Sequence, residues 1–510
     1  MHRHVRETTV AAAILTAAFG GAACGGGGST PVAPSTPHPS PVARLARGPY
    51  LQSAPEGSVT VAWYQDVAVG SRVDWRLEGG VWQQAPSTGG ASLRYEAVLS
   101  GLQAQSRYSY RVVGGTGGPM PDTAGRTEFS FRTPRADTFK MVVMGDTGSG
   151  EPRQYDVAAR LATEDPPPDW VLIVGDLIYP HGEDAGYDPQ FFAPYRALLS
   201  TVPFYAALGN HDCETSSGGP FLAVFTLPCN CPSSLAPETA YWIDRAGVLT
   251  IVHNTNLPPA TLRDVALPWH TTVARRAAAF RIAVLHHPPF ASGPNSQAPP
   301  TATIRSLFPP ALSASGTDLV LSGHEHFYER TRPIGGVVYV TTGNGGYDLY
   351  PRETVNAFTA AFDNTVCGYT VVEVQGRQLT LRHTATDGRT VDSFVLSKPL
   401  AASDPVEVLA ARAPGEAPRV RASFHVERAR RAEAVTLRLL GEGPLAARLN
   451  GTPIAWAEGS SENGDFAAFD VDPGRLASGR NLLELESRVA PGRAMRAPVA
   501  EVVVLERTTP

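Results

Sequence analysis

The stretch "DLVLSGHEH", residues 318–326, places two histidines directly behind an apolar run and a glycine. In an extended chain, side chains at positions i and i+2 point to the same side, so we expect His324 and His326 to face one place. A glycine at this point lets the backbone turn sharply and approach a ligand closely. The stretch therefore predicts a buried strand whose end carries ligands.

Four further segments repeat this arrangement. They are "FKMVVMGDTG" with Asp146, "DWVLIVGDLIY" with Asp176 and Tyr179, "VPFYAALGNHD" with Asn210 and His211, and "FRIAVLHHPP" with His286 and His287. Active sites of open α/β sheets lie beyond the carboxyl ends of the strands. One such segment is a weak signal, because a lone Gly-Asp is usually a turn. Five in series predict a single site.

The residue types at these strand ends predict a metal centre. Carboxylates, an amide oxygen, imidazoles and a phenol suit hard or borderline cations. The predicted ligands are Asp146, Asp176, Tyr179, Asn210, His286, His324 and His326. Seven groups exceed the four of a tetrahedral zinc site, so we expect two metals with Asp176 between them. Two metals about 3.5–4 Å apart can stabilise both the attacking and the leaving oxygen of a phosphoryl transfer.

The pattern along the chain predicts three domains, in keeping with 510 residues. Residues 45–134 contain short alternating strands separated by turn residues, which is typical of an antiparallel β-sandwich. Residues 138–398 alternate apolar runs with helical stretches at 153–164 and 189–200, which indicates an α/β domain. Residues 404–510 are again rich in strands.

The N-terminus predicts export. A basic start, a short apolar run and "GGAAC" form a signal peptide over residues 1–24. Its end resembles a bacterial lipoprotein signal, so we expect lipidation at Cys24 and a flexible linker over 25–44. The predicted location is the periplasm, outer membrane or cell surface of a bacterium, with plain secretion as the alternative. We expect membrane contact only through this lipid anchor.

The composition and the net charge limit the kinds of partner that the protein can bind. The formal net charge is −5, and 18% of the residues are charged, which argues against a nucleic-acid partner. The oligomeric state does not follow from the sequence. The even number of cysteines beyond the signal suggests disulfides in an exported protein. These are Cys213, Cys229, Cys231 and Cys367, and the favoured bond joins Cys213 to Cys229 or Cys231.

Taken together, the five segments resemble the calcineurin-like metallophosphoesterase superfamily and, more narrowly, the purple acid phosphatases. Tyr179, three residues after Asp176, carries the narrower resemblance, together with "GHEHFYER" (323–330) and "YVTTGNGG" (339–346). The resemblance covers about residues 45–398. It implies a central α/β sandwich of two mixed sheets flanked by helices.

The flanking segments carry resemblances of their own. "LSGLQAQSRYSYRV" (99–112) resembles fibronectin type III domains, with Leu102 as core leucine and Tyr108 as corner tyrosine. "ARLNG" (447–451) followed by "DPGRLASGRNLLELES" (472–487) resembles jelly-roll modules of the galactose-binding-like kind. Function does not follow from such a fold alone.

The purple acid phosphatase resemblance also implies roles for residues. Asp146, Tyr179 and His326 would hold Fe(III), Asn210, His286 and His324 a divalent ion (Fe, Zn or Mn), and Asp176 would bridge them. A metal-bound hydroxide would attack the phosphorus of a small phosphate monoester. His211 would bind phosphate or protonate the leaving alcohol, and Asn210 would also contact the substrate. His287 is a further candidate for substrate binding, which the resemblance does not itself imply.

One departure from the plant-type pattern concerns acid catalysis. Asn295 and Ser296 stand where those relatives carry additional histidines. His287, His181 or His253 are possible substitutes, among which the sequence does not choose. His287 reads equally well as a supporting residue, and Glu325 is expected to point away and hold no metal. The alternative functions are a phosphodiesterase or nucleotide-processing enzyme, and a surface-binding protein with a vestigial site.

Overall fold

The computed structural model describes residues 43–53, 55–90, 92–115, 117–400, 404, 407–409, 419–427, 432–440, 445–457, 466–487 and 499–508. The predicted signal peptide, Cys24 and the linker up to residue 42 lie outside this range. Among the described residues, no helix has the length and apolar character needed to cross a membrane.

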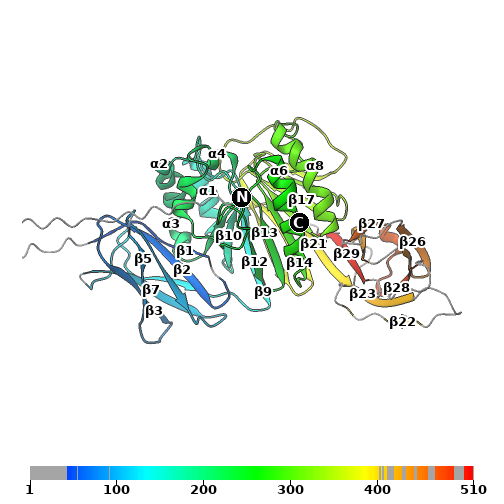
Figure 1. The fold of residues 1–510 in the computed structure, drawn as a ribbon, viewed down its shortest axis with the longest axis horizontal. Coiled ribbons are helices and arrows are strands. Elements are labelled where there is room, and N and C mark those ends of the chain that lie inside the picture. Colours follow the sequence, from blue (N-terminus) through cyan, green and yellow to red (C-terminus); the bar gives the residue numbers. More distant parts are fainter. Residues whose placement is uncertain are drawn as a thin grey trace, which may run out of the picture. The chain divides into compact units, whose positions relative to one another are not determined.

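The first described segment folds into two four-stranded antiparallel sheets around one core (Figure 1). One sheet has the order β1 (Leu45–Gln52), β2 (Ser58–Gln65), β6 (Arg94–Ser100), β5 (Thr88–Gly89). The other has the order β4 (Gln83–Pro86), β3 (Ser71–Leu77), β7 (Arg107–Gly114), β8 (Phe129–Arg132). Leu102 is buried, and the Tyr108 hydroxyl accepts the backbone N–H of Gln103 at 2.8 Å, as expected for a corner tyrosine.

The central segment contains two mixed sheets, as predicted. The first begins with β11 (Phe204–Ala206), β10 (Trp170–Ile173), β9 (Thr138–Met144), β19 (Gly368–Gln375), β20 (Gln378–Ala385) and β21 (Thr390–Leu400). The second has the order β12 (Tyr241–Arg245), β13 (Val248–Val252), β14 (Phe280–Leu285), β15 (Leu319–Ser322), β17 (Val338–Thr342), β16 (Tyr328–Thr331), β18 (Thr359–Asp363). Strands β9–β11 are mutually parallel, and so are β13, β14, β15 and β17.

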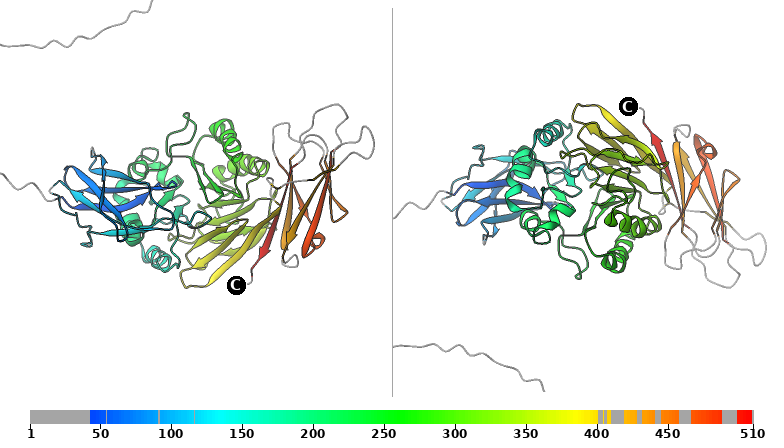
Figure 2. Two further views of the ribbon diagram at one scale, coloured as in Figure 1. Left: turned by 90° about the horizontal axis from the view of Figure 1, so that it is seen from below. Right: turned by 90° about the horizontal axis from the view of Figure 1, so that it is seen from above.

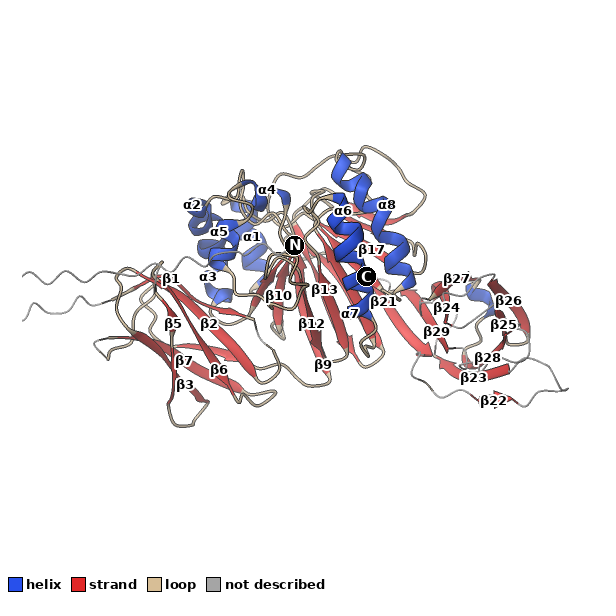
Figure 3. Cartoon of the chain, in the orientation of Figure 1, coloured by secondary structure: helices blue, strands red, loops and turns tan. Residues whose placement is uncertain are grey.

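Helices flank both sheets (Figure 3). Those before β12 are α1 (Pro152–Leu161), α2 (Asp184–Tyr187), the π-helical turn η1 (Asp188–Phe192), α3 (Ala193–Leu199), α4 (Asn210–Glu214) and α5 (Gly219–Val224). Those after β13 are α6 (Pro259–Thr261), η2 (Leu262–Ala266), α7 (Leu267–Ala274) and α8 (Pro299–Ala314). The predicted helical stretches 153–164 and 189–200 correspond to α1 and to η1 with α3. One core joins apolar residues of both sheets, and a second lies between α8 and the outer face of the second sheet.

The last segment continues the first central sheet instead of standing apart from it. Strand β29 (Val499–Arg507) pairs with β21, and β24 (Ala432–Leu440) and β27 (Ala467–Val471) follow, so that the sheet has nine strands. The red C-terminal strand lies beside the yellow strand in both views of Figure 2. The expected boundary near residue 404 is thus no break in the sheet, because β29 occupies the edge that β21 would otherwise expose.

A second sheet completes this C-terminal module. Its order is β22 (Glu407–Leu409), β23 (Arg419–Val426), β28 (Gly479–Ser487), β25 (Leu445–Leu449), β26 (Thr452–Ala457), and the turn η4 (Pro473–Arg475) precedes β28. A core of its own lies between the two sheets. The module is therefore a β-sandwich that shares one sheet with the central segment.

Candidate metal centre

The predicted ligands follow the strands as expected. Asp146 comes after β9, Asp176 after β10, His286 after β14 and His324 after β15, and Asn210 is the first residue of α4 behind β11. Neighbouring parallel strands end at one edge of a sheet, and the two sheets pack on a shared core. Both sheets therefore contribute ligands to one place.

The backbone at three of these ligands adopts the left-handed conformation, with φ of 56° at Asp146, 54° at Asp176 and 67° at His324. Residues other than glycine rarely adopt it, and such residues cluster at functional sites. Glycine is needed at two positions next to the predicted ligands, because any side chain there would collide with a carboxylate. A Cβ atom on Gly209 would lie 2.0 Å from Oδ1 of Asp176, and one on Gly323 would lie 2.5 Å from Oδ2 of Asp146.

One half of the site gathers around the hydroxyl of Tyr179. This oxygen lies 3.3 Å from Oδ1 of Asp146, 3.2 Å from Oδ2 of Asp176 and 3.1 Å from Nε2 of His326. His326 Nε2 is 3.4 Å from Asp146 Oδ1. All four side chains are at most 5% exposed. These are the residues expected to hold Fe(III), with Asp176 at their border.

The other half gathers around His286. Its Nε2 lies 3.2 Å from Oδ2 of Asp176 and 3.0 Å from Oδ1 of Asn210. Asp176 thus contacts both halves through the same oxygen, as its predicted bridging position requires. Asn210 and His324 are only partly buried, so this half faces the open side of the site.

Two of the histidines are oriented in the way that metal-binding histidines usually are. Nδ1 of His286 donates to the carbonyl of Val174 at 2.9 Å, and Nδ1 of His326 donates to the carbonyl of Asp348 at 2.6 Å. Such a bond fixes the tautomer and leaves Nε2 free to bind a metal. In both residues that free Nε2 is the atom directed at the carboxylates.

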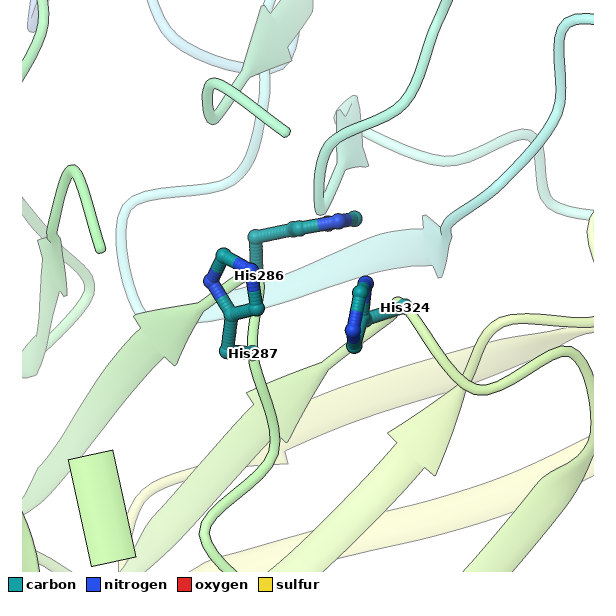
Figure 4. A group of neighbouring side chains, drawn as sticks. All are labelled: His286, His287 and His324. Atoms are coloured by element: carbon teal, nitrogen blue, oxygen red, sulfur yellow. The ribbon is translucent and has the colours of Figure 1, made fainter. Parts of the chain in front are cut away.

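A third group of ring nitrogens involves a residue outside the predicted ligand set. His286, His287 and His324 lie together where β14 and β15 end (Figure 4). One ring nitrogen of each lies within 4.8 Å of the others, as is also true of ligand atoms of Asp146, Asp176 and His286. His287 is 2% exposed, so it is neither an exposed residue nor a distant one.

Electrostatics without metal follow from burial and from the close pairs. Burial favours the neutral form of His286, but the charge of Asp176 outweighs it and raises the pKa of His286 to about 9. Burial opposes ionisation of Asp176 as well, yet His286 lowers the pKa of Asp176 below its usual range. Burial and then His286 lower the pKa of His324 to about 3. Because metals bind neutral imidazole, metal binding must displace the proton of His286.

His211 lies at the rim, half buried. Its backbone N–H donates to Oδ1 of Asp176 at 2.9 Å, and its ring packs on Tyr179 with a centroid distance of 4.4 Å. Nδ1 donates to the carbonyl of Pro180 and is 3.6 Å from Oε1 of Glu214. Nε2 is consequently the ring nitrogen that neither of these two groups contacts.

The possible substitutes for the missing acid lie in different places. His181 is exposed and pairs with Glu214 at 2.5 Å. His253 is fully buried, and its ring bonds to His270 at 3.0 Å. His287 is the one of the three that the structure brings to the metal ligands. Glu325 is buried, and its Oε2 would lie 2.2 Å from a Cβ atom on Gly293.

The predicted disulfide is wrong. Cys213, Cys229, Cys231 and Cys367 are all free thiols. Cys213 packs against the central core, and the thiol of Cys231 is directed at the carbonyl of Ala236 at 3.7 Å instead. The segment between Cys213 and Cys231 is held by other contacts, among them the Tyr64 hydroxyl on the carbonyl of Ala223 at 2.7 Å.

Sequence reasoning missed the residues that hold the ligands in place. The buried carboxylate of Asp212 accepts backbone N–H groups of Asp176, Leu177 and Gly209 at 2.9–3.0 Å. Gln190 holds the backbone of Tyr179 through two bonds of 2.8 Å, one to its N–H and one to its carbonyl. Of these two residues, only Asp212 could have been suspected from the sequence, because it directly follows Asn210 and His211 in "GNHD". Gln190 lies 11 residues from Tyr179 in an ordinary helical pattern.

Two aromatic rings behind the site were missed as well. Tyr347 stacks on Tyr179 at a centroid distance of 3.8 Å, and Tyr350 stacks on His326 at 3.8 Å. Both follow the predicted "YVTTGNGG" segment. These contacts hold the phenol and the imidazole in their planes.

Comparison with known proteins gives the class first. Residues 139–328 match the family model described as calcineurin-like phosphoesterase, so this part of the chain is a calcineurin-like phosphoesterase domain. Within that class, matches to purple acid phosphatases confirm the resemblance found in the motifs. The match to purple acid phosphatase 21 of Arabidopsis thaliana has 28% identity over 273 residues and covers 49% of this chain and 58% of the relative.

Two further comparisons extend beyond that domain. "Probable inactive purple acid phosphatase 1" of Arabidopsis thaliana is 23% identical over 452 residues, which is 72% of this chain and 71% of the relative. The structure of purple acid phosphatase PPD1 from yellow lupin (Lupinus luteus) seeds has 19% identity and a TM-score of 0.59, and covers 68% of this chain and 74% of that one. The latter match establishes the fold alone. The chain spans 58% and 62% of the length of purple acid phosphatases 21 and 23 of Arabidopsis thaliana.

Proposed function

We propose that the chain is a metal-dependent phosphatase of the purple acid phosphatase type, which hydrolyses phosphate monoesters with two metal ions. The observation that supports this most is the arrangement around Asp176. Its Oδ2 lies 3.2 Å both from the Tyr179 hydroxyl and from Nε2 of His286, so one carboxylate touches two ligand groups. Few structural roles need such a set of acidic, imidazole and phenol groups within one buried site.

The donor set suits the metals that the family resemblance implies. Asp146, Tyr179 and His326 would hold Fe(III), Asn210, His286 and His324 a divalent ion (Fe, Zn or Mn), and Asp176 would bridge them. The fixed Nδ1 bonds of His286 and His326 support this assignment. The two cations would supply a nucleophile at neutral pH and neutralise the charge that develops on the phosphoryl group.

The chain's own residues would position the substrate and move one proton. The partly exposed residues Asn210, His211 and His324 border the open side, where a phosphate ester would enter. With Nδ1 of His211 donating to the carbonyl of Pro180, its Nε2 would contact a phosphate oxygen or, when protonated, donate to the leaving alcohol.

The position of Asn295 and Ser296 favours substrates whose leaving group needs little protonation. Neither side chain can donate a proton as an imidazolium does, so His211 would be left as the proton donor without help from these two positions. p-Nitrophenyl phosphate should therefore react faster than an alkyl phosphate. Equal rates on the two would contradict this part of the proposal.

The test measures metal content and substrate preference together. Purified protein should contain two metal ions per chain and should cleave p-nitrophenyl phosphate faster than bis-p-nitrophenyl phosphate, and Asp176→Asn should abolish both reactions. A faster diester reaction would favour the phosphodiesterase alternative. Near-zero bound metal would favour the binding-protein alternative, to which a relative named "probable inactive" gives some support.

We propose export of the protein with a lipid on Cys24, since the first 24 residues have the pattern of a lipoprotein signal. Expression in a bacterium with labelled palmitate should label the wild-type protein, and Cys24→Ser should abolish the label. An unlabelled protein found in the medium would indicate plain secretion.

A further inference from the structure

His287 belongs to a compact cluster of three imidazoles. The ring centroids of His287 and His324 are 4.5 Å apart, those of His286 and His287 5.1 Å, and those of His286 and His324 5.2 Å. One ring nitrogen of each residue lies within 4.8 Å of the other two. No pair is much closer than the others, so the rings surround one point (Figure 4).

The end of β14 explains how two adjacent residues reach the same point. Consecutive residues of a strand point to opposite faces, but β14 ends at Leu285, so His286 and His287 are not bound by this alternation. Strand β15 runs parallel beside it with Leu285 opposite Ser322, and the N–H of Gly323 donates to the carbonyl of His286 at 3.0 Å. This register places His324 next to both histidines.

The hydrogen bonding of His287 repeats that of two predicted metal ligands. Its Nδ1 is 2.8 Å from the hydroxyl of Thr255, just as Nδ1 of His286 and of His326 are each bonded to a carbonyl. When Nδ1–H donates to Thr255, the lone pair of Nε2 is free. Thr255 is itself buried, 4% exposed, so water does not compete readily for this bond.

We infer that His287 is a third imidazole ligand of the divalent metal, beside His286 and His324, and that the site therefore selects zinc over manganese. Imidazole suits zinc, whereas manganese prefers carboxylate and water oxygen. The inference rests on the proposed function only in that a divalent ion binds here. It does not depend on which ester, if any, the protein hydrolyses.

The experiment measures metal binding rather than turnover. The full-length protein is stripped of metal, and the affinities for zinc and for manganese are determined by competition with a chromophoric chelator. His287→Ala should weaken zinc binding by more than about 100-fold, the upper end for loss of an outer hydrogen-bond partner. Thr255→Val, which keeps the ring and removes the hydroxyl, should weaken it by only about 10-fold. Manganese binding should weaken less than zinc binding in His287→Ala, because manganese gains less from imidazole.

A second measurement separates a ligand from a supporting residue. X-ray absorption at the zinc edge of the zinc-loaded protein should count one imidazole fewer per chain in His287→Asn than in wild type. His287→Asn serves as the second variant because it keeps a polar side chain if the alanine variant does not fold. His425→Ala on β23, an exposed histidine outside the site, is the matched control and should bind zinc like the wild type.

The outcomes are distinct. An unchanged zinc affinity or imidazole count in a folded His287→Asn protein would overturn the inference. An unchanged number of imidazoles at zinc together with a raised KM for p-nitrophenyl phosphate would also overturn the inference, because His287 would then contact the substrate and not the metal. If no variant and no wild-type preparation hydrolyses any ester, the proposed function fails, while the zinc affinities still test the inference.

Discussion

The groups that surround Tyr179 determine whether its hydroxyl is protonated. Asp146, Asp176 and His326 lie within 3.3 Å of its hydroxyl, Tyr347 stacks on its ring, and Gln190 holds its backbone. Burial, and then the two carboxylates, raise the pKa of this phenol well above its usual value in the metal-free protein. The phenol therefore stays protonated until a metal ion that is a strong Lewis acid displaces its proton.

Tyr179→Phe should remove the visible absorption band of the iron-loaded protein, because the band requires a phenolate on Fe(III). The ring and its stacking on Tyr347 are kept, so the thermal unfolding curve should change little. Tyr347→Phe, which keeps the stack and leaves Tyr179 intact, should retain the band. A coloured Tyr179→Phe protein would show that the phenol is not a ligand.

His383 is a buried histidine outside the site whose protonation should limit stability in acid. It bonds to Asn344 and Thr370 at 3.0 Å each, and burial lowers its pKa to about 3. In the unfolded chain its pKa is near 6.5, so the unfolded state takes up a proton first as pH falls. The stability associated with the neutral ring is complete above pH 6.5 and is lost as pH falls from 6.5 towards 3.

From pH 7 to pH 4 this one group should lower the free energy of unfolding by about 3 kcal/mol. His383→Gln, which retains a donor and an acceptor, should show a shallower loss over the same range. Denaturant unfolding at several pH values measures it. His425→Gln, on an exposed surface, should follow the wild-type curve, and a His383→Gln protein that does so too would refute the assignment.

At the scale of elements, the short helix α4 organises the open half of the site. It carries Asn210 and His211 on its first turn, and the third residue, Asp212, is fully buried. The Asp212 carboxylate accepts backbone N–H groups from two segments, the loop after β10 and Gly209. It thereby fixes the spacing between Asp176 and Asn210.

Asp212→Ala should weaken metal binding by about 10- to 100-fold, as loss of a partner that orients ligands usually does. Unfolding should also be easier by about 2–4 kcal/mol, because several buried N–H groups lose their acceptor. Chelator competition and denaturant unfolding measure the two effects. Asp264 is exposed in η2, the turn before α7. Asp264→Ala should leave the metal affinity and the free energy of unfolding unchanged. Wild-type metal affinity in Asp212→Ala would contradict this role.

At the scale of the whole molecule, the C-terminal module is connected to the site strands by buried ion pairs. Asp318, directly before β15, accepts from Arg438 of β24 at 2.6 Å and pairs with Lys398 of β21 at 2.9 Å. Arg438 also donates to the carbonyls of Thr317 and Gly336, before β15 and β17. The opposite end of β15 leads to His324, so the module supports a strand that carries a predicted ligand.

Arg438→Ala should lower the free energy of unfolding by about 3–5 kcal/mol, the usual cost of leaving a buried partner uncompensated. The same variant should unfold the central segment and the C-terminal module together, because they share one sheet. Arg448→Ala, an exposed arginine of the same module, should unfold like the wild type. A calorimetric transition in which the C-terminal module of the wild-type protein unfolds before the central segment would contradict the shared sheet.

The sequence by itself determined which polar side chains stand at the strand ends and the order of elements, because these depend on local chemistry. An apolar run that ends in glycine and a polar side chain predicts a strand end wherever it occurs, and five such ends in series predicted Asp146, Asp176, Tyr179, Asn210, His286, His324 and His326. Alternating strands likewise predicted sheets in the first and last segments. Only the tertiary structure decided which side chains meet across the sheets.

Contacts between distant segments account for the three features that the sequence did not predict. Cys213 is a free thiol that packs against the core, and no spacing of cysteines along the chain reveals this. The continuation of the central sheet by β29 depends on which edge was open. The place of His287 beside His324 depends on the register of β14 and β15 and on Thr255, 32 residues away. Contacts between distant segments form only when the whole chain is folded, so their consequences appear in the structure alone.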